Sequence, residues 1–168
     1  MYTNKKVTIL KIKNIVYKLI LFTMSTIKFK SFHESAIIPT IATEGSVGYD
    51  LYTPVDFIVR QGTMKCIDIH IGVQPPPGYF ALIKSRSGLA FRNQFDVLAG
   101  VIDTDFVHPL KIMLKNHGKI DYEFKAGDRI AQLILVKYCC PPIEIVDEFP
   151  ETNRCKDVEY GGLGSTGK

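Results

Sequence analysis

Apolar and polar residues alternate along several stretches of this chain, and helical periodicity is hard to find. Successive side chains of a β-strand point to opposite faces, so alternation predicts a strand with one buried face. In residues 66–73, one side of such a strand would carry Ile67, Ile69, Ile71 and Val73. Residues 27–31, 79–83, 110–114 and 130–138 are further strand-like runs, and the last is the longest.

Turn sequences separate these runs at intervals of roughly ten residues, a spacing typical of all-β sandwiches and barrels. They are Gln61-Gly62, Pro75-Pro76-Pro77-Gly78, Asn116-His117-Gly118-Lys119 and Lys125-Ala126-Gly127-Asp128. Glycine, proline and asparagine favour turns because of their backbone preferences. The one helix candidate is a turn or two at residues 87–92. We therefore expect an all-β sandwich or barrel with one short helix.

The distribution of charge limits the partners of the chain. Its 168 residues carry a formal net charge of +4, but residues 1–23 hold five lysines and no acid. Subtracting those five from the 21 basic residues leaves 16 against 17 acidic residues, so residues 24–168 carry about −1. Nucleic-acid binders show an extended basic surface. We therefore expect no stable nucleic-acid binding, and any attraction for phosphate has to be local.

The chain is long enough for one domain with a hydrophobic core, which we place at residues 24–150. Residues 1–23 could be a signal peptide, but no small-residue cleavage site follows the apolar run. They could be a mitochondrial-type transit segment, but they lack arginine. We favour Met24 as the natural start, with residues 1–23 a disordered or non-native extension. The apolar run at residues 15–22 is too short to span a bilayer, so we expect no membrane association.

Cysteine and histidine positions bear on compartment and metal binding. The four cysteines are Cys66, Cys139, Cys140 and Cys155, and none form a CxxC pair. We expect reduced, mostly buried thiols and an intracellular protein, cytoplasmic and/or nuclear and not secreted. The four histidines are scattered without metal-ligand spacing.

Arg86-Ser87-Gly88 opens the helix candidate and suits an anion. The first N–H groups of a helix have no intrahelical acceptor, and arginine offers a planar fork of donors to phosphate oxygens. The alternative is an ordinary helix start with a surface arginine.

Asp103 follows Val101 and Ile102, where a strand would end and hold its carboxylate still. It could orient water or accept a proton from it, or it could be an ordinary turn acid. Phe106 could pack on a sugar or fill the core.

Residues 127–133 lead from a turn into the longest strand. Here Asp128 and Arg129 could pair with each other in a structural hairpin. Gln132 is a polar residue in an apolar strand and needs a buried partner or a ligand.

The C-terminal stretch, residues 151–168, is polar and then glycine-rich, so we expect a flexible tail. Its GxxxxGK spacing does not make a phosphate loop, because no Ser or Thr follows Lys168.

Five segments together resemble the motifs of one enzyme family, in the family's order. They are VGYDLY at residues 47–52, KSRSGLA at 84–90, GVIDTDF at 100–106, GDRIAQL at 127–133 and GGLGSTG at 161–167. Over about residues 26–168 the chain is similar to the trimeric deoxyuridine triphosphatases (dUTPases).

The resemblance implies a β jelly roll that assembles as a homotrimer, with active sites between subunits and the tail of residues 151–168 closing over the nucleotide. The implied reaction is hydrolysis of dUTP to dUMP and pyrophosphate, which keeps uracil out of DNA and supplies dUMP. Asp103 would be catalytic and would orient the water that attacks the α-phosphorus. Mg²⁺ would be held by the triphosphate and by water, with Asp50 acting through a water molecule.

The resemblance also implies a set of substrate-binding residues. Arg86, Ser87, Gly88 and Gln132 would contact phosphates, backbone atoms around Val97, Ala99, Gly100 and Val101 would read uracil, and Phe106 would pack on the deoxyribose. Ile102, Lys111, Leu163, Gly164 and Ser165 complete the set.

The chain departs from the family pattern in three places. Phe106 stands where the family usually has tyrosine, and Val107-His108-Pro109 follows where the family often has a glycine-containing turn. In the fifth motif, Val158 stands where the family usually has an arginine and Leu163 where it has a phenylalanine. Arg154 and Tyr160 could substitute for the missing arginine and phenylalanine.

The alternative function is a dUTPase-fold nucleotide-binding or regulatory protein with weak or no hydrolysis. The presence of Asp103 favours the enzyme, because a binder needs no water-orienting acid.

Overall fold

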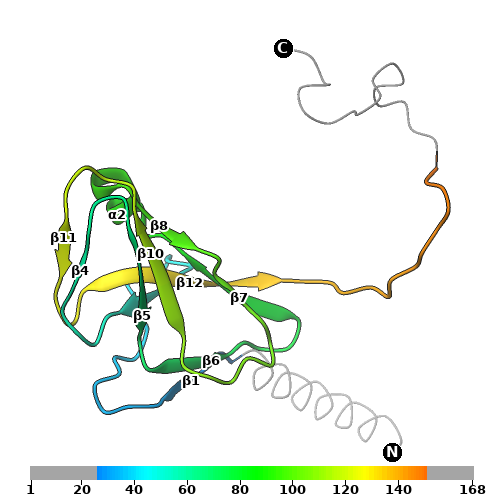
Figure 1. Cartoon of the computed structure of the whole chain (residues 1–168). Helices are drawn as coiled ribbons and strands as arrows, with labels where there is room; N and C mark the ends of the chain where they lie inside the picture. The colour runs from blue at the N-terminus through cyan, green and yellow to red at the C-terminus, as the bar shows by residue number, and fades with distance from the viewer. Residues whose placement is uncertain (1–25, 151–168) are drawn as a thin grey trace, which may run out of the picture.

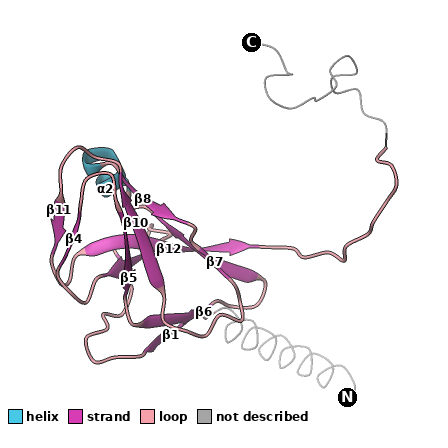
Figure 2. Cartoon of the chain, in the orientation of Figure 1, coloured by secondary structure: helices cyan, strands magenta, loops and turns pink. Residues whose placement is uncertain are grey.

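The structure is a computed structural model that describes residues 26–150, and β-strands dominate it (Figure 2). The elements are β1 (Lys28–Ser31), β2 (Thr40–Ile41), β3 (Tyr49–Tyr52), β4 (Phe57–Val59), β5 (Met64–Asp68), β6 (Ile71–Gln74), β7 (Tyr79–Lys84), α2 (Ser87–Asn93), β8 (Phe95–Leu98), β9 (Val101–Ile102), β10 (Lys111–Asn116), β11 (Tyr122–Phe124) and β12 (Arg129–Lys137). The short helix and the expected strands are confirmed, except over residues 66–73. Within residues 26–150, no helix has the length and apolar character needed to cross a membrane. The expected N-terminal extension and C-terminal tail lie outside these residues.

The strands form an open, two-layered, jelly-roll-like arrangement, as expected (Figure 1). The largest sheet has the order β2-β3-β12-β7-β9, and a second sheet has the order β5-β10-β8. The pairs β1-β6 and β11-β4 complete the described fold, and all pairings are antiparallel. One hydrophobic cluster joins Leu51, Ile83 and Leu133 of the larger sheet to residues of the second sheet, such as Ile112 and Leu114. Burying each such side chain contributes about 1.5–3 kcal/mol.

Alternation along the strands explains why they pack in this way. In β8, Phe95 and Val97 are buried whereas Asp96 and Leu98 are exposed. In β4, Ile58 is exposed between two buried residues. These two strands therefore offer one apolar face to the core.

Residues 66–73 form two strands and not the single strand that we expected. β5 ends at Asp68, whose Oδ1 accepts the backbone N–H of His70 at 2.8 Å. His70 has φ +56°, in the left-handed region, and β6 begins at Ile71. β5 pairs with β10 whereas β6 pairs with β1, so the bend carries the chain between sheets. The prediction of one buried face over residues 66–73 is confirmed, because its four β-branched residues are all buried.

The expectation about the cysteines is half right. Cys66, Cys139 and Cys140 are free thiols, as expected, but all three are exposed and not buried. Cys66 lies on the outward face of β5, and the other two follow the end of β12. Cys155 lies outside the described residues.

The chain leaves the body of the fold after β12. Residues 138–150 contain no regular element and extend away from the sheets (Figure 1, orange). Ile143 and Ile145 are both 94% exposed, and Phe149 is 88% exposed. This segment buries little apolar surface against its own chain.

Candidate active site

A cavity of about 270 Å³ gathers residues from three separate parts of the sequence. It is lined by Ala42, Ser46, Val47, Gly48, Asp50, Arg86, Ser87, Gly88, Arg129 and Gln132. Strand pairing brings these parts together, because in the largest sheet Gln132 of β12 lies opposite Asp50 of β3 on one side and Lys84 of β7 on the other. Five of the expected site residues, Asp50, Arg86, Ser87, Gly88 and Gln132, therefore share one cavity.

Asp50 holds two arginines in this cavity. Its Oδ1 accepts from Arg86 Nε at 3.0 Å, and its Oδ2 accepts from Arg129 Nη1 at 3.1 Å. Arg86 Nη1 also donates to the carbonyl oxygen of Arg129 at 3.1 Å. The Asp50 side chain is 11% exposed, whereas that of Arg129 is 45% exposed. The three side chains carry a net charge of about +1, and the two guanidinium groups keep N–H donors that Asp50 does not use. The cavity is therefore suited to an anion.

Gln132 occupies a tightly limited position. Its Nε2 donates to the carbonyl oxygen of Ser85 at 2.9 Å, which provides the partner that a polar residue in this strand requires. Across the cavity, a Cβ on Gly48 would lie 2.5 Å from Gln132 Oε1. Glycine at position 48 therefore leaves room for the side chain of Gln132.

The short helix starts as expected at the edge of this cavity. Arg86 precedes α2 in an extended conformation, with φ −79° and ψ 136°, and its side chain makes no capping hydrogen bond. The side chain instead turns to Asp50 and is 27% exposed, so the alternative of an ordinary surface arginine is wrong. The N–H groups of Ser87 and Gly88 belong to the first turn, where backbone donors have no intrahelical acceptor.

The segment expected to read the base follows α2 and changes sheets. β8 pairs with β10, whereas β9 pairs with β7. Between them, Ala99 has φ +58° and Gly100 has φ +102°. Ile83 N–H donates to the Gly100 carbonyl oxygen at 2.8 Å, and a Cβ on Gly100 would lie 2.4 Å from the Ile83 oxygen. Glycine is needed here both for the positive φ and for the close approach of β7.

Like the base-reading segment with Val97, Ala99, Gly100, Val101 and Ile102, the expected site residues Asp103, Phe106 and Lys111 do not line the cavity. Asp103 follows the end of β9, in a turn closed by the Phe106 N–H and the Asp103 carbonyl oxygen, and its side chain is exposed. The ring of Phe106 contacts His108 edge-on and is 36% exposed, so the alternative that it fills the core is wrong. Lys111 begins β10 opposite Asp68. Leu163, Gly164 and Ser165 lie outside the described residues.

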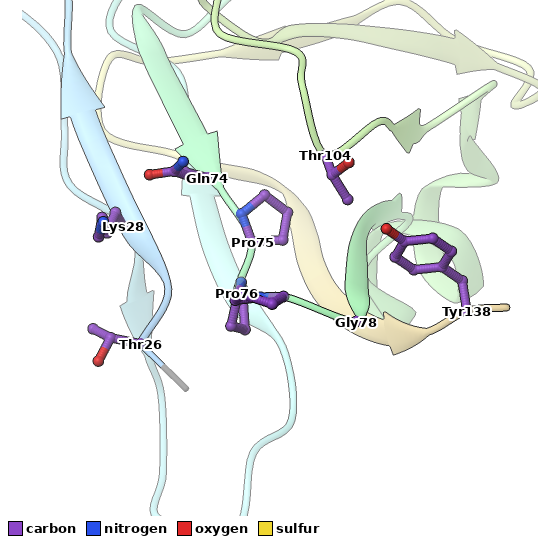
Figure 3. A pocket seen from close by; sticks show the side chains of 9 residues that line it. Thr26, Lys28, Gln74, Pro75, Pro76, Gly78, Thr104 and Tyr138 are labelled. Atoms are coloured by element: carbon purple, nitrogen blue, oxygen red, sulfur yellow. The ribbon is translucent and has the colours of Figure 1, made fainter. Parts of the chain in front are cut away.

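A larger cavity of about 480 Å³ lies next to the Asp103 turn (Figure 3). It is lined by Thr26, Lys28, Gln74, Pro75, Pro76, Pro77, Gly78, Thr104 and Tyr138. Among the described residues that line it, Lys28 is the one charged side chain and none is a carboxylate. It contains none of the expected site residues, so the cationic cavity around Asp50 is the better candidate for chemistry on an anion.

Sequence reasoning missed Arg129. The suggested pairing of Arg129 with Asp128 is wrong, because Arg129 pairs with Asp50, and the Asp128 carboxylate accepts the backbone N–H of Lys125. A charged residue at the start of a buried strand, three residues before Gln132, was the available signal.

Metal ligands are sparse in the described part of the chain. Among residues 26–150, no group of three or more His, Cys, Asp or Glu side chains is arranged to hold a metal ion. Both carboxylate oxygens of Asp50 already accept from arginines. A direct bond from Asp50 to a cation would therefore have to displace an arginine.

The chain is similar to known proteins over most of its length. The sequence profile of the dUTPase family matches residues 34–167. A deoxyuridine 5'-triphosphate nucleotidohydrolase from Arabidopsis thaliana is 44% identical over 140 residues, which cover 83% of this chain and 82% of that protein.

Two solved structures share the fold. The dUTPase of Staphylococcus bacteriophage 80alpha with dUpNHpp has a TM-score of 0.76 at 24% identity, covering 85% of this chain and 99% of that one. A mutant dUTPase of phage phi11 of S. aureus, described with a structural Mg(II) ion, has a TM-score of 0.68 at 24% identity, covering 74% of this chain and 98% of that one. On the extent of the profile match and the identity to its relatives, the chain belongs to the dUTPase family.

Proposed function

We propose that this chain hydrolyses dUTP to dUMP and pyrophosphate by attack of water on the α-phosphorus. The observation that carries the proposal is the pair of arginines, Arg86 and Arg129, held by Asp50 beside Gln132 in one cavity. Membership of the dUTPase family, with a 44% identical nucleotidohydrolase, supports the same substrate. The product dUMP would serve nucleotide synthesis, and removal of dUTP would keep uracil out of DNA.

The phosphates of the nucleotide would lie in the Asp50 cavity. Arg86 and Arg129 present planar groups of donors, which suit phosphate oxygens better than a lysine ammonium does. Because Asp50 fixes both guanidinium groups, little side-chain entropy remains to be lost when the anion binds. Ser87, Gly88 and Gln132 add neutral donors at the same cavity.

Asp103 would orient the attacking water or accept its proton. Because Asp103 does not line the phosphate cavity of its own chain, this role requires the Asp103 turn of one copy to meet the Asp50 cavity of another. We therefore propose that the protein is a homotrimer with shared active sites. Exposed apolar residues around the turn, Val101 at 62% and Val107 at 66%, support contact with another subunit, as do the exposed side chains of residues 138–150.

Uracil would be read by the backbone of residues 97–101. Backbone donors and acceptors in a tight turn hold a fixed pattern, so cytosine, with the opposite pattern, would leave polar groups unpaired. The half-exposed ring of Phe106 would pack on the deoxyribose and leave no room for a ribose 2′-OH.

Magnesium would act with the bound nucleotide. When bound, Mg²⁺ neutralises charge on the phosphate oxygens and so favours attack by water. Asp50 would contribute only through a water molecule, because its oxygens are engaged by arginines. We expect EDTA to abolish pyrophosphate release from dUTP and Mg²⁺ to restore it; unchanged turnover in EDTA would contradict a role for the metal.

The tail would close over the nucleotide, with Arg154 and Tyr160 taking the places of an arginine and an aromatic residue at positions 158 and 163. Arg154→Ala tests this, because it should raise KM for dUTP if Arg154 binds phosphate.

We also propose an intracellular location, since free exposed thiols such as Cys66 persist in a reducing compartment.

Asp103→Asn tests the mechanism directly. The amide keeps the size of the carboxylate but cannot accept a proton, so we expect kcat for dUTP to fall at least about 100-fold, the low end of the contribution of a general base. The affinity for dUpNHpp should change little. Asp121→Asn is a matched control, because Asp121 is exposed, lies outside the cavity, and accepts the backbone N–H of Gln61 through Oδ1. Binding of dUpNHpp without any hydrolysis of dUTP by the unaltered protein would favour the regulatory alternative.

A further inference from the structure

Ser85 lies between the two parts of the proposed nucleotide site. It follows the last residue of β7 and directly precedes Arg86. Its carbonyl oxygen accepts from Gln132 Nε2, which lines the phosphate cavity. Its side chain forms hydrogen bonds with β8, and β8 begins the segment proposed to read the base.

The Ser85 hydroxyl makes two hydrogen bonds to β8. Oγ donates to Asp96 Oδ1 at 2.7 Å and accepts the backbone N–H of Val97 at 2.9 Å. The same N–H also reaches Asp96 Oδ1 at 2.8 Å, so the three groups form a closed triangle. A hydroxyl is suited to this place because it donates and accepts at once.

A second bond holds the other end of the same segment. Ile83, two residues before Ser85, donates its N–H to the carbonyl oxygen of Gly100 at 2.8 Å. The stretch from residue 96 to residue 100 is therefore attached at both ends to residues 83–85.

The charge of Asp96 contributes to this arrangement. Asp96 is exposed, yet the hydrogen bond from Ser85, followed by that from Val97 and the nearby Lys84 and His117, holds the pKa of its carboxyl below the ordinary value. The carboxylate is therefore ionised at neutral pH and is available as an acceptor for Ser85.

We infer that Ser85 is a positioning residue that couples occupation of the phosphate cavity to the geometry of the base-reading segment. The identity of the ligand rests on the proposed function, but the coupling itself does not. An anion that draws Gln132 and the turn of Arg86 into place would act on Ser85 through its backbone. The Ser85 hydroxyl would then hold Val97 and its neighbours in the conformation that recognises uracil.

Ser85→Ala isolates this role. It removes both hydroxyl bonds, but the Val97 N–H keeps Asp96 Oδ1 as acceptor, so we expect the variant to fold. Ser85→Thr restores a hydroxyl and should rescue the effect. Ser31→Ala is a matched control, because it also removes a serine hydroxyl with one hydrogen bond, to the His33 carbonyl oxygen at the end of β1.

The first measurement needs no catalysis. Pyrophosphate, which has no base, is added to the full-length protein, and hydrogen exchange of the Val97 amide is followed. We expect pyrophosphate to slow this exchange at least about threefold in the unaltered protein, in Ser85→Thr and in Ser31→Ala, and to leave it unchanged in Ser85→Ala. The same slowing in Ser85→Ala, or no slowing in the unaltered protein, would overturn the coupling.

The second measurement uses the reaction. For Ser85→Ala we expect the preference for dUTP over dCTP in kcat/KM to fall about tenfold, with Ser85→Thr close to the unaltered protein. A lower kcat/KM with an unchanged preference would show a merely structural role and refute the inference. Absence of dUTP hydrolysis in the unaltered protein would refute the proposed function, while the exchange experiment would still decide the coupling.

Discussion

Replacing Asp50 by asparagine removes the charge that organises the phosphate cavity. The substitution keeps the size of the side chain, and Oδ1 can still accept from Arg86. The new amide group takes the place of Oδ2 and cannot accept from Arg129 Nη1. One charge-assisted hydrogen bond is lost, and the other loses its negative partner.

The structure sets the magnitude of this effect. A hydrogen bond to a charged group contributes about 1.5–3 kcal/mol, and exposed ion pairs contribute about 0–1 kcal/mol. Arg129 is 45% exposed whereas Arg86 is 27% exposed, so the loss lies in the lower part of the range for charged hydrogen bonds, at about 1.5–2.5 kcal/mol of unfolding free energy. For a domain of this size, this corresponds to a fall in Tm of about 3–10 °C.

Activity should fall with stability, because both guanidinium groups lose their fixed positions. We expect kcat/KM for dUTP to drop about 10–100-fold, mainly through KM, which corresponds to about 1.4–2.8 kcal/mol. The assays are pyrophosphate release and thermal denaturation at pH 7. As a control, Asp56→Asn removes one acceptor of the exposed Lys125 ion pairs, away from the cavity, and should leave kcat/KM for dUTP unchanged. An Asp50→Asn protein with Tm within 2 °C and kcat/KM within about twofold of the unaltered protein would refute this reasoning.

Two further predictions concern stability. Gly100→Ala should lower the unfolding free energy measured in urea by about 2–3 kcal/mol, because Cβ would meet the Ile83 oxygen, φ is positive and a hydrogen bond is strained. Gly62 also has a positive φ, +68°, but no atom lies within 4 Å of the Cβ that Gly62→Ala would add. Gly62→Ala should therefore lower the unfolding free energy only by the cost of a positive φ for alanine. Equal losses of unfolding free energy at both positions would contradict the close-approach argument. Hydrogen bonding to the Ala126 N–H lowers the pKa of the Asp56 carboxyl in the folded protein. The carboxylate therefore stabilises the fold above the unfolded pKa of about 3.9. This stabilisation is lost as the pH falls through the lower pKa of the folded protein. The Tm difference between Asp56→Asn and the unaltered protein should therefore shrink below about pH 4, and a constant difference from pH 3 to 7 would exclude this linkage.

The local pattern of the chain was sufficient to predict its class of fold. Period-two alternation and turn residues identified the strands, and β10, with its alternating buried residues, lies where residues 110–114 predicted a strand. The start of α2 at Ser87 and the end of β9 before Asp103 were also predicted. These features depend on neighbours along the sequence, because the direction of a side chain from a strand or helix is set within a few residues.

Tertiary structure decided which of these features meet. The pairing of Arg129 with Asp50 depends on the register of β12 against β3, which joins residues far apart in the chain. The bend at His70 likewise carries the chain from one sheet to another, although alternation alone predicted one strand. The separation of Asp103 from the phosphate cavity depends on where β9 joins the larger sheet. Alternation specifies which face of a strand is buried, whereas the partner across that face depends on long-range pairing that no local pattern contains.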